Sequence, residues 1–137
     1  MDNRGECLFV ANCMAKNLTV SRPFTAAKYD FIIDNGLGLV KIQVKSAHQW
    51  KSQKHRECWN FNTKTLVSSE VVAYSPAHID FLALHCIELG TWYIIPADEI
   101  GGRKAIYIYP TTGKGLYEDF RERWGLLTTF CPKALQQ

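Results

Sequence analysis

The sequence predicts an α+β fold in which helices near both ends of the chain flank a set of β-strands. Residues 5–16 carry apolar side chains at the spacing of one helix face. The pair Asn35-Gly36 separates two apolar runs, and Asn-Gly between such runs is the strongest short signal for a β-hairpin. Two later apolar runs, 79–88 and 91–96, are joined by Leu89-Gly90 and indicate buried strands.

The other expected elements are short and follow from local patterns. We expect hairpin strands at 29–34 and 39–45, further strands at 18–21, 59–61 and 105–109, a polar basic loop at 46–57 and a short helix that begins at 98 and stops at Gly101-Gly102. An amphipathic helix is predicted over 116–124, because Leu116, Phe120 and Trp124 recur every four residues. The tail after Cys131 is expected to fray.

Length and composition predict one globular domain that spans residues 1–137. The chain is 47% apolar and 21% charged, which argues against disorder, and no run of about 18 uncharged apolar residues is present. The charged start MDNRGE does not lead into a signal-peptide core. The five scattered cysteines form no CxxC pair and are typical of reduced thiols, so we expect a cytoplasmic protein without a membrane segment.

Four polar residues are candidates for one site: Glu6, Asp30, Gln43 and Lys45. A hairpin centred on the Asn-Gly turn would bring Asp30 back beside Gln43. Side chains alternate along a strand, so Gln43 and Lys45 should share a face while Val44 points to the other side. Each residue alone is an ordinary surface charge or strand end, but their combination favours a functional site.

These residue types suit a hard divalent cation, Mg²⁺ or Mn²⁺, next to a phosphate group. Mg²⁺ takes oxygen ligands and keeps several waters, so one or two carboxylates and a phosphate oxygen suffice. Asp30, the Gln43 amide oxygen and the Val44 carbonyl are the candidate ligands, and Glu6 would hold a metal-bound water or bind directly. Lys45 would steady the scissile phosphate or orient the attacking water. The sequence therefore predicts phosphodiester cleavage.

A basic stretch follows the candidate site. Residues 41–56 contain five Lys or Arg and two His but no acid, within a chain of net charge +3. Such a run is often only a solvated loop, but beside a nuclease site we expect it to contact the phosphates of double-stranded DNA. The candidate DNA-binding residues are Lys28, Ser46, His48, Lys51, Lys54 and Arg56.

The order of these motifs resembles the PD-(D/E)xK nuclease superfamily. Within it, the pattern is similar to that of the small endonucleases associated with group I introns, which also have a helix with Glu, a "YD" strand, a "QVK" strand and a later block like FLALHCIELGTWYIIP. The resemblance covers residues 5–101. It implies a restriction-endonuclease-like fold, with a central mixed β-sheet flanked by helices, and metal-dependent DNA cleavage by an intron-encoded homing enzyme.

Two residues depart from the family pattern. Tyr29 stands where the family has Pro, which carries no chemistry, and Gln43 stands where Asp or Glu is usual. A neutral amide binds metal less tightly than a carboxylate, so the number of metal ions stays open. Two alternatives also stay open: a Holliday-junction resolvase or repair nuclease, and a non-catalytic DNA-binding module whose site has decayed.

The predicted activity also implies assembly. One such site cuts one strand, so a double-strand break needs at least two subunits, and closed symmetry makes a dimer or a tetramer the expected homo-oligomer.

Overall fold

The computed structural model describes residues 3–51 and 57–132. Its elements, in chain order, are α1 (Asn3–Ala15), β1 (Thr19–Ser21), β2 (Phe31–Asp34), β3 (Leu39–Ala47), β4 (Gln49–Lys51), β5 (Glu57–Asn62), β6 (Lys64–Val67), β7 (Glu70–Ala73), β8 (Phe81–Cys86), β9 (Thr91–Pro96), the 3₁₀ helix η1 (Ala97–Ile100), β10 (Ala105–Ile108), the 3₁₀ helix η2 (Glu118–Phe120) and α2 (Gly125–Thr129). Within these residues no helix is long and apolar enough to cross a membrane.

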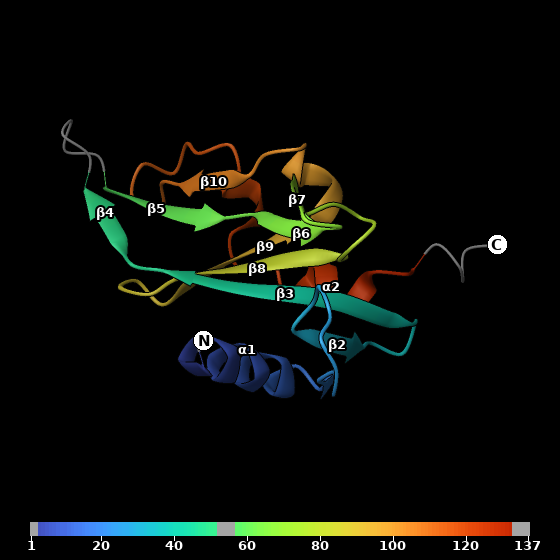
Figure 1. Cartoon of the computed structure of the whole chain (residues 1–137). Coiled ribbons are helices and arrows are strands. Elements are labelled where there is room, and N and C mark those ends of the chain that lie inside the picture. The colour runs from blue at the N-terminus through green and yellow to red at the C-terminus, as the bar shows by residue number, and fades with distance from the viewer. Residues whose placement is uncertain (1–2, 52–56, 133–137) are drawn as a thin grey trace.

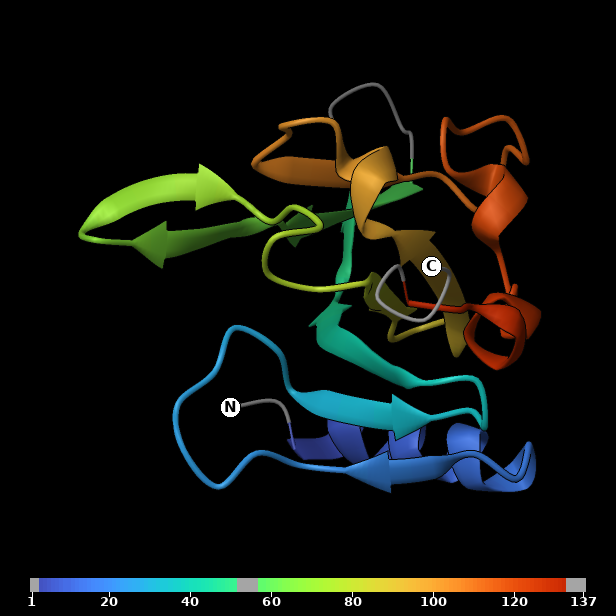
Figure 2. The same cartoon turned by 90° about the vertical axis from the view of Figure 1, so that its right-hand side faces the viewer.

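A mixed five-stranded sheet organises the fold, in the order β1-β2-β3-β8-β9. The β3–β8 pair is parallel, from Ile42 opposite Phe81 to Ala47 opposite Cys86, and the other three pairs are antiparallel. A second sheet has the order β10-β5-β4, and β6 and β7 form a separate hairpin. This hairpin projects from the body of the molecule (Figure 2). The mixed sheet confirms the predicted fold class.

The central sheet lies between two layers (Figure 1). On one face, Phe9 of α1 packs in a buried cluster with Val40, Ile42 and Val44 of β3. On the other face, alternate residues of β8 and β9 pack against the second sheet in a cluster that includes Leu82, Leu84, Tyr93, Trp59 and Ile106. All six residues of β8 are buried, because this strand is covered on both faces.

The predicted Asn-Gly hairpin is confirmed as β2 and β3, with Asp34 opposite Leu39. Gly36 has a φ of 84°, a left-handed conformation that glycine adopts without steric cost. The Asn35 side chain accepts hydrogen bonds from the backbone N–H groups of Leu37 and Gly38, at 2.8 and 3.1 Å. Its amide group also donates to carbonyls of the α2 segment, so this turn is tied to the C-terminal part of the fold.

The helix predicted over 116–124 is wrong. The chain instead forms η2, then an extended bridge between Arg121 and Tyr93, then α2. Glu122 has a φ of 51°, and its backbone N–H donates to the Trp92 carbonyl at 2.7 Å. Pairing with the edge of β9 therefore overrides the helical periodicity in this segment.

The loop predicted over 46–57 is also wrong in part. β3 continues to Ala47, and β4 pairs with β5, with Gln49 opposite Trp59. Residues 52–56 lie outside the described part of the chain. The β6–β7 hairpin was not predicted at all: its turn is Ser68-Ser69, with φ values of 51° and 65°. Those angles suit a primed hairpin turn, but Ser-Ser is not one of its strong sequence signals.

Candidate functional site

Asp30 lies just before β2 and is held by the backbone of β3. Its N–H donates to the Ile42 carbonyl at 2.8 Å, and the Val44 N–H donates to its Oδ2 at 2.9 Å. Burial raises the pKa of the Asp30 carboxyl, while the Val44 N–H, Lys45 and Arg22 act in the opposite direction. The hairpin thus places a half-buried carboxylate beside the segment Gln43-Val44-Lys45, as the strand pattern predicts.

Gln43 and Lys45 share one face of β3. Val40, Ile42 and Val44 are buried on the α1 side, and the half-buried residues alternate with them. The Lys45 Nζ lies 5.8 Å from the centre of the Tyr74 ring, within the range of a cation–π contact. The ammonium group is therefore placed by the fold on the side of the sheet opposite α1.

Tyr74 belongs to this site, and sequence reasoning missed it. The residue follows β7, its side chain is buried, and its N–H donates to the Thr63 carbonyl at 2.8 Å. Burial raises the pKa of Tyr74, the negative charge of Asp30 raises it further, and a hydrogen bond with Thr65 lowers it. No sequence signal links residue 74 to residues 30 and 45, because only the return of the chain after the β6–β7 hairpin brings them together.

Glu6 lies in the first turn of α1 and pairs with Arg22, with 3.4 Å between Oε2 and Nη2. The Arg22 guanidinium also lies 5.1 Å from the Phe31 ring, and its charge acts on Asp30. The positive charge of Arg22 therefore acts on both acidic candidates, Glu6 and Asp30. The sequence analysis did not include Arg22 among the site residues, since its distance along the chain from Glu6 and its loop position give no signal.

Among the candidate DNA-binding residues that the structure describes, Lys28, Ser46 and His48 each contact a different part of the fold. The Lys28 ammonium donates to the Leu66 carbonyl, and the Ser46 hydroxyl lies 3.4 Å from Nδ1 of His85. His48 contacts Glu88. The side chain of Lys51 and the residues Lys54 and Arg56 lie outside what the structure describes.

Glu88 joins the two sheets at the point where β3 passes into β4. Its Oε1 accepts hydrogen bonds from the Gln49 N–H at 2.7 Å and the Trp59 indole N–H at 3.0 Å, and its Oε2 lies 2.8 Å from Nδ1 of His48. The His48 contact, followed by the two N–H donors, lowers the pKa of Glu88 to about 2. His48, a candidate DNA-binding residue, therefore already has Glu88 as a partner within the fold.

The oxygen donors near Asp30 fit a metal site that the substrate completes. Within the described residues no group of three or more His, Cys, Asp or Glu side chains could hold a metal ion. Asp30 offers a carboxylate whose Oδ2 is oriented by the Val44 N–H, and Gln43 is the residue before Val44 on β3. This donor set suits Mg²⁺, which needs one or two carboxylates and binds substrate phosphate and water at its other positions.

Comparison with known proteins gives a family match and a similar fold. The family model described as PD-(D/E)XK endonuclease matches residues 2–114. The solved structure of a bacterial homing endonuclease, I-Ssp6803I, is similar with a TM-score of 0.76 and 24% identity, over 92% of this chain and 89% of that one. Comparison with curated proteins gives no match. Because the family model covers most of the sequence, the chain belongs to the PD-(D/E)XK endonuclease family.

Proposed function

We propose that this protein is a Mg²⁺- or Mn²⁺-dependent DNA endonuclease that hydrolyses phosphodiester bonds. One observation carries the proposal: the backbone of β3 orients the Asp30 carboxylate beside Gln43 and Lys45 in a chain of the PD-(D/E)XK family. A partly buried carboxylate whose charge is supported by a backbone N–H and two nearby cations is well suited to a metal ion.

The ligands would be Asp30, the Gln43 amide oxygen, the Val44 carbonyl and Glu6, directly or through water. When bound, the metal ion offsets negative charge on the phosphate and makes water a stronger nucleophile. Asp30 holds its orientation because the Val44 N–H occupies Oδ2. Arg22 pairs with Glu6, and its positive charge partly opposes the rise in the pKa of Asp30 that burial causes.

Lys45 would bind the scissile phosphate or orient the attacking water. Its ammonium lies over the Tyr74 ring, which limits the directions that this long side chain can take. Tyr74 is a positioning residue in this proposal, because it acts on the phosphate only through Lys45.

Double-stranded DNA is the proposed substrate. Backbone phosphates would be contacted by Lys28, Lys51, Lys54 and Arg56. Ser46 and His48 would have to contact DNA while they keep their partners within the fold.

The similarity to a bacterial homing endonuclease supports a site-specific homing enzyme encoded within an intron. We further propose a single cytoplasmic domain over residues 1–137 that assembles as a dimer or tetramer to cut both strands.

The test is cleavage of a plasmid library with Mg²⁺, with Mn²⁺ and with a chelator. The wild type should cut only with metal, and Asp30→Asn should lower the rate by a factor of about 100 or more, since about 1.4 kcal/mol of barrier is tenfold in rate. The matched control is Asp98→Asn, the same substitution at an exposed position in η1. If Asp30→Asn cleaves DNA at the wild-type rate, Asp30 is not a metal ligand. If the wild type cleaves a four-way junction in preference to a linear duplex, the protein is a resolvase rather than a homing enzyme.

A further inference from the structure

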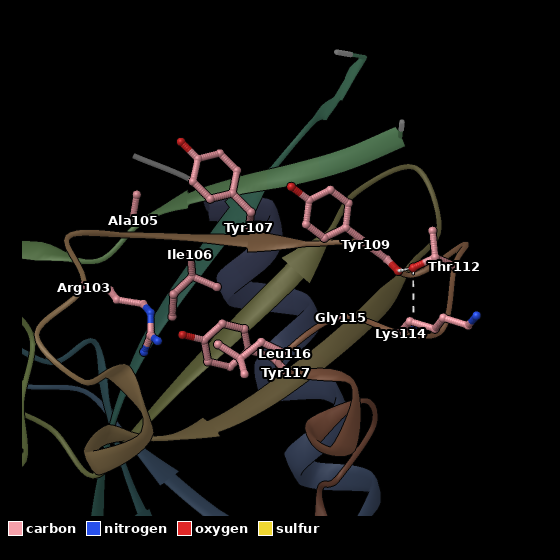
Figure 3. Close-up of a pocket in the computed structure, with 10 residues that line it drawn as sticks. All are labelled: Arg103, Ala105, Ile106, Tyr107, Tyr109, Thr112, Lys114, Gly115, Leu116 and Tyr117. Carbon is pink, nitrogen blue, oxygen red and sulfur yellow. Dashed lines mark hydrogen bonds between the residues drawn. The ribbon is translucent and has the colours of Figure 1, made fainter. Parts of the chain in front are cut away.

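A groove of about 720 Å³ is lined by β10, which is an edge strand of the second sheet, and by the segment that follows β10. Figure 3 shows Arg103 at one end and Lys114 at the other, with Ile106 and Tyr117 between them. The segment that includes Gly115 and Tyr117 forms the opposite wall. The groove therefore has a positive side chain at each end.

Backbone groups of β10 face this groove. In the described part of the chain β10 pairs with β5 alone. The Thr63 N–H donates to the Lys104 carbonyl, and in an antiparallel ladder hydrogen-bonded pairs alternate with non-hydrogen-bonded pairs. Ile106 therefore directs its N–H and C=O toward β5, while Ala105 and Tyr107 direct theirs into the groove. The edge offers donors and acceptors in alternation, as a pairing strand requires.

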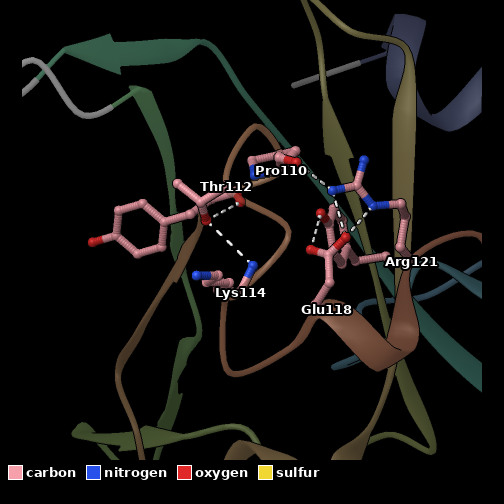
Figure 4. Close-up of polar contacts among 7 residues, drawn as sticks. Pro110, Thr112, Lys114, Glu118 and Arg121 are labelled. Carbon is pink, nitrogen blue, oxygen red and sulfur yellow. Dashed lines mark hydrogen bonds and ion pairs between the residues drawn. The ribbon is translucent and has the colours of Figure 1, made fainter.

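The wall opposite β10 is held in place by a set of polar contacts (Figure 4). The Arg121 guanidinium donates to the Pro110 carbonyl and to the Glu118 carboxylate, which also accepts from the buried Tyr93 hydroxyl at 3.0 Å. The Thr112 hydroxyl accepts from the Lys114 N–H at 3.3 Å. These contacts hold in place the segment that lines the groove opposite β10.

The lining chemistry indicates what the groove binds. Among its lining residues the charged ones are Arg103 and Lys114, both cationic. The Tyr117 hydroxyl is buried without a hydrogen-bond partner among the described residues, which costs free energy unless a ligand supplies one. We infer that the groove binds an extended peptide segment with acidic side chains near both ends, which adds to β10 as a further strand.

Two other occupants fit less well. A second copy paired through β10 would bring the cations Arg103 and Lys114 of the two copies together. Nucleic-acid phosphates are acceptors and leave the carbonyls of Ala105 and Tyr107 without donors, whereas a peptide backbone supplies both kinds of group. The inference is independent of the proposed nuclease function, because it uses none of its residues.

The test uses a fluorescein-labelled, end-blocked peptide, Glu-Thr-Val-Thr-Glu, and fluorescence anisotropy with the full-length protein. Arg103→Glu and Lys114→Glu should each weaken binding about tenfold, because each reverses a charge beside a carboxylate. The matched control, Lys104→Glu, changes an exposed neighbour outside the groove and should bind as the wild type does. A peptide with Lys at both ends should bind the double variant Arg103→Glu/Lys114→Glu better than the wild type.

Two further measurements separate strand addition from charge attraction. A peptide N-methylated at its central residue should bind at least tenfold more weakly, because it loses a backbone donor. Tyr117→Phe should leave the melting temperature unchanged or raise it, yet weaken peptide binding. The inference is overturned if the wild type does not bind the peptide at millimolar concentration, if N-methylation has no effect, or if a short oligothymidylate binds more tightly than the peptide.

Discussion

At the scale of single residues, the candidate site depends on how two charged groups are held. Asp30 is oriented by the Val44 N–H, and Lys45 is placed over the Tyr74 ring. Both constraints come from the hairpin and from the chain segment after β7, not from neighbours in sequence. Orientation of this kind is what a nuclease needs, since a small displacement of a catalytic group costs much of its effect.

The contact between Lys45 and Tyr74 makes a specific prediction for catalysis. Tyr74→Leu should lower kcat for DNA cleavage about tenfold, because a desolvated cation–π contact is worth up to about 2 kcal/mol. Tyr74→Phe keeps the ring and should retain most of the activity. Single-turnover cleavage at saturating DNA measures the rate, and KM should change little in both variants.

A readout that does not need cleavage accompanies this prediction. In protein with ¹³C-dimethylated lysines, the ring current of residue 74 should shift the NMR signal of Lys45 in the wild type and in Tyr74→Phe, but not in Tyr74→Leu. Thermal unfolding identifies a variant that fails to fold. If Phe and Leu lower kcat equally and the Lys45 signal is the same in all three proteins, the ring does not position the lysine.

At the scale of elements, the join between the two sheets rests on Glu88. This one carboxylate accepts hydrogen bonds from β4 and from Trp59 of β5, and it also contacts His48. It therefore holds β4 at the position where the chain leaves the central sheet for the second one.

This contact predicts how stability depends on pH. The pKa of Glu88 is lowered from 4.5 to about 2 in the folded state, so its contribution to stability is present above pH 4.5 and is lost as pH falls toward 2. Glu88→Gln keeps an acceptor for the two N–H donors but loses the charge. Urea unfolding at pH 7 and at pH 3 should show a stability difference between wild type and Glu88→Gln that narrows at the lower pH.

The variant Glu88→Ala provides the comparison for this test. It removes all three contacts, so it should be less stable than Glu88→Gln at both pH values. A difference between wild type and Glu88→Gln that stays constant from pH 7 to pH 3 would contradict the lowered pKa.

At the scale of the whole molecule, the proposed DNA binding depends on basic residues that follow β3. Replacing Lys51, Lys54 and Arg56 with Ala should weaken DNA binding, and the slope of log K against log salt should fall by about 0.9 for each phosphate that the variant no longer neutralises. Binding titrations of the Asp30→Asn protein at several salt concentrations measure the slope without cleavage. An unchanged slope would place these side chains away from the DNA.

Assembly is the second prediction at this scale. If the protein makes double-strand breaks, two sites must act on opposite strands, so we expect a dimer or tetramer at micromolar concentration. Sedimentation velocity, free and with DNA, measures the mass. A monomer in both conditions, together with cleavage of both strands, would contradict the prediction.

Local patterns were enough to predict several parts of this molecule. The helix at the N-terminus, the hairpin around Asn35-Gly36 and the buried strands β8 and β9 all match the structure, because each has a signal within a few residues. Hairpin pairing also follows from the turn, so the proximity of Asp30 to the segment Gln43-Val44-Lys45 was predictable. The order of these motifs led to the family to which the chain belongs.

Tertiary structure alone decided the rest. The periodic segment 116–124 does not form the predicted helix, because its backbone pairs with β9 at Arg121 and Glu122. Tyr74, and the pairing of Arg22 with Glu6, join the candidate site from distant parts of the chain. Local sequence patterns predict helices, strands and turns. Contacts between residues distant in sequence form only when the sheets pack, and those contacts determine the surroundings of Asp30 and Lys45.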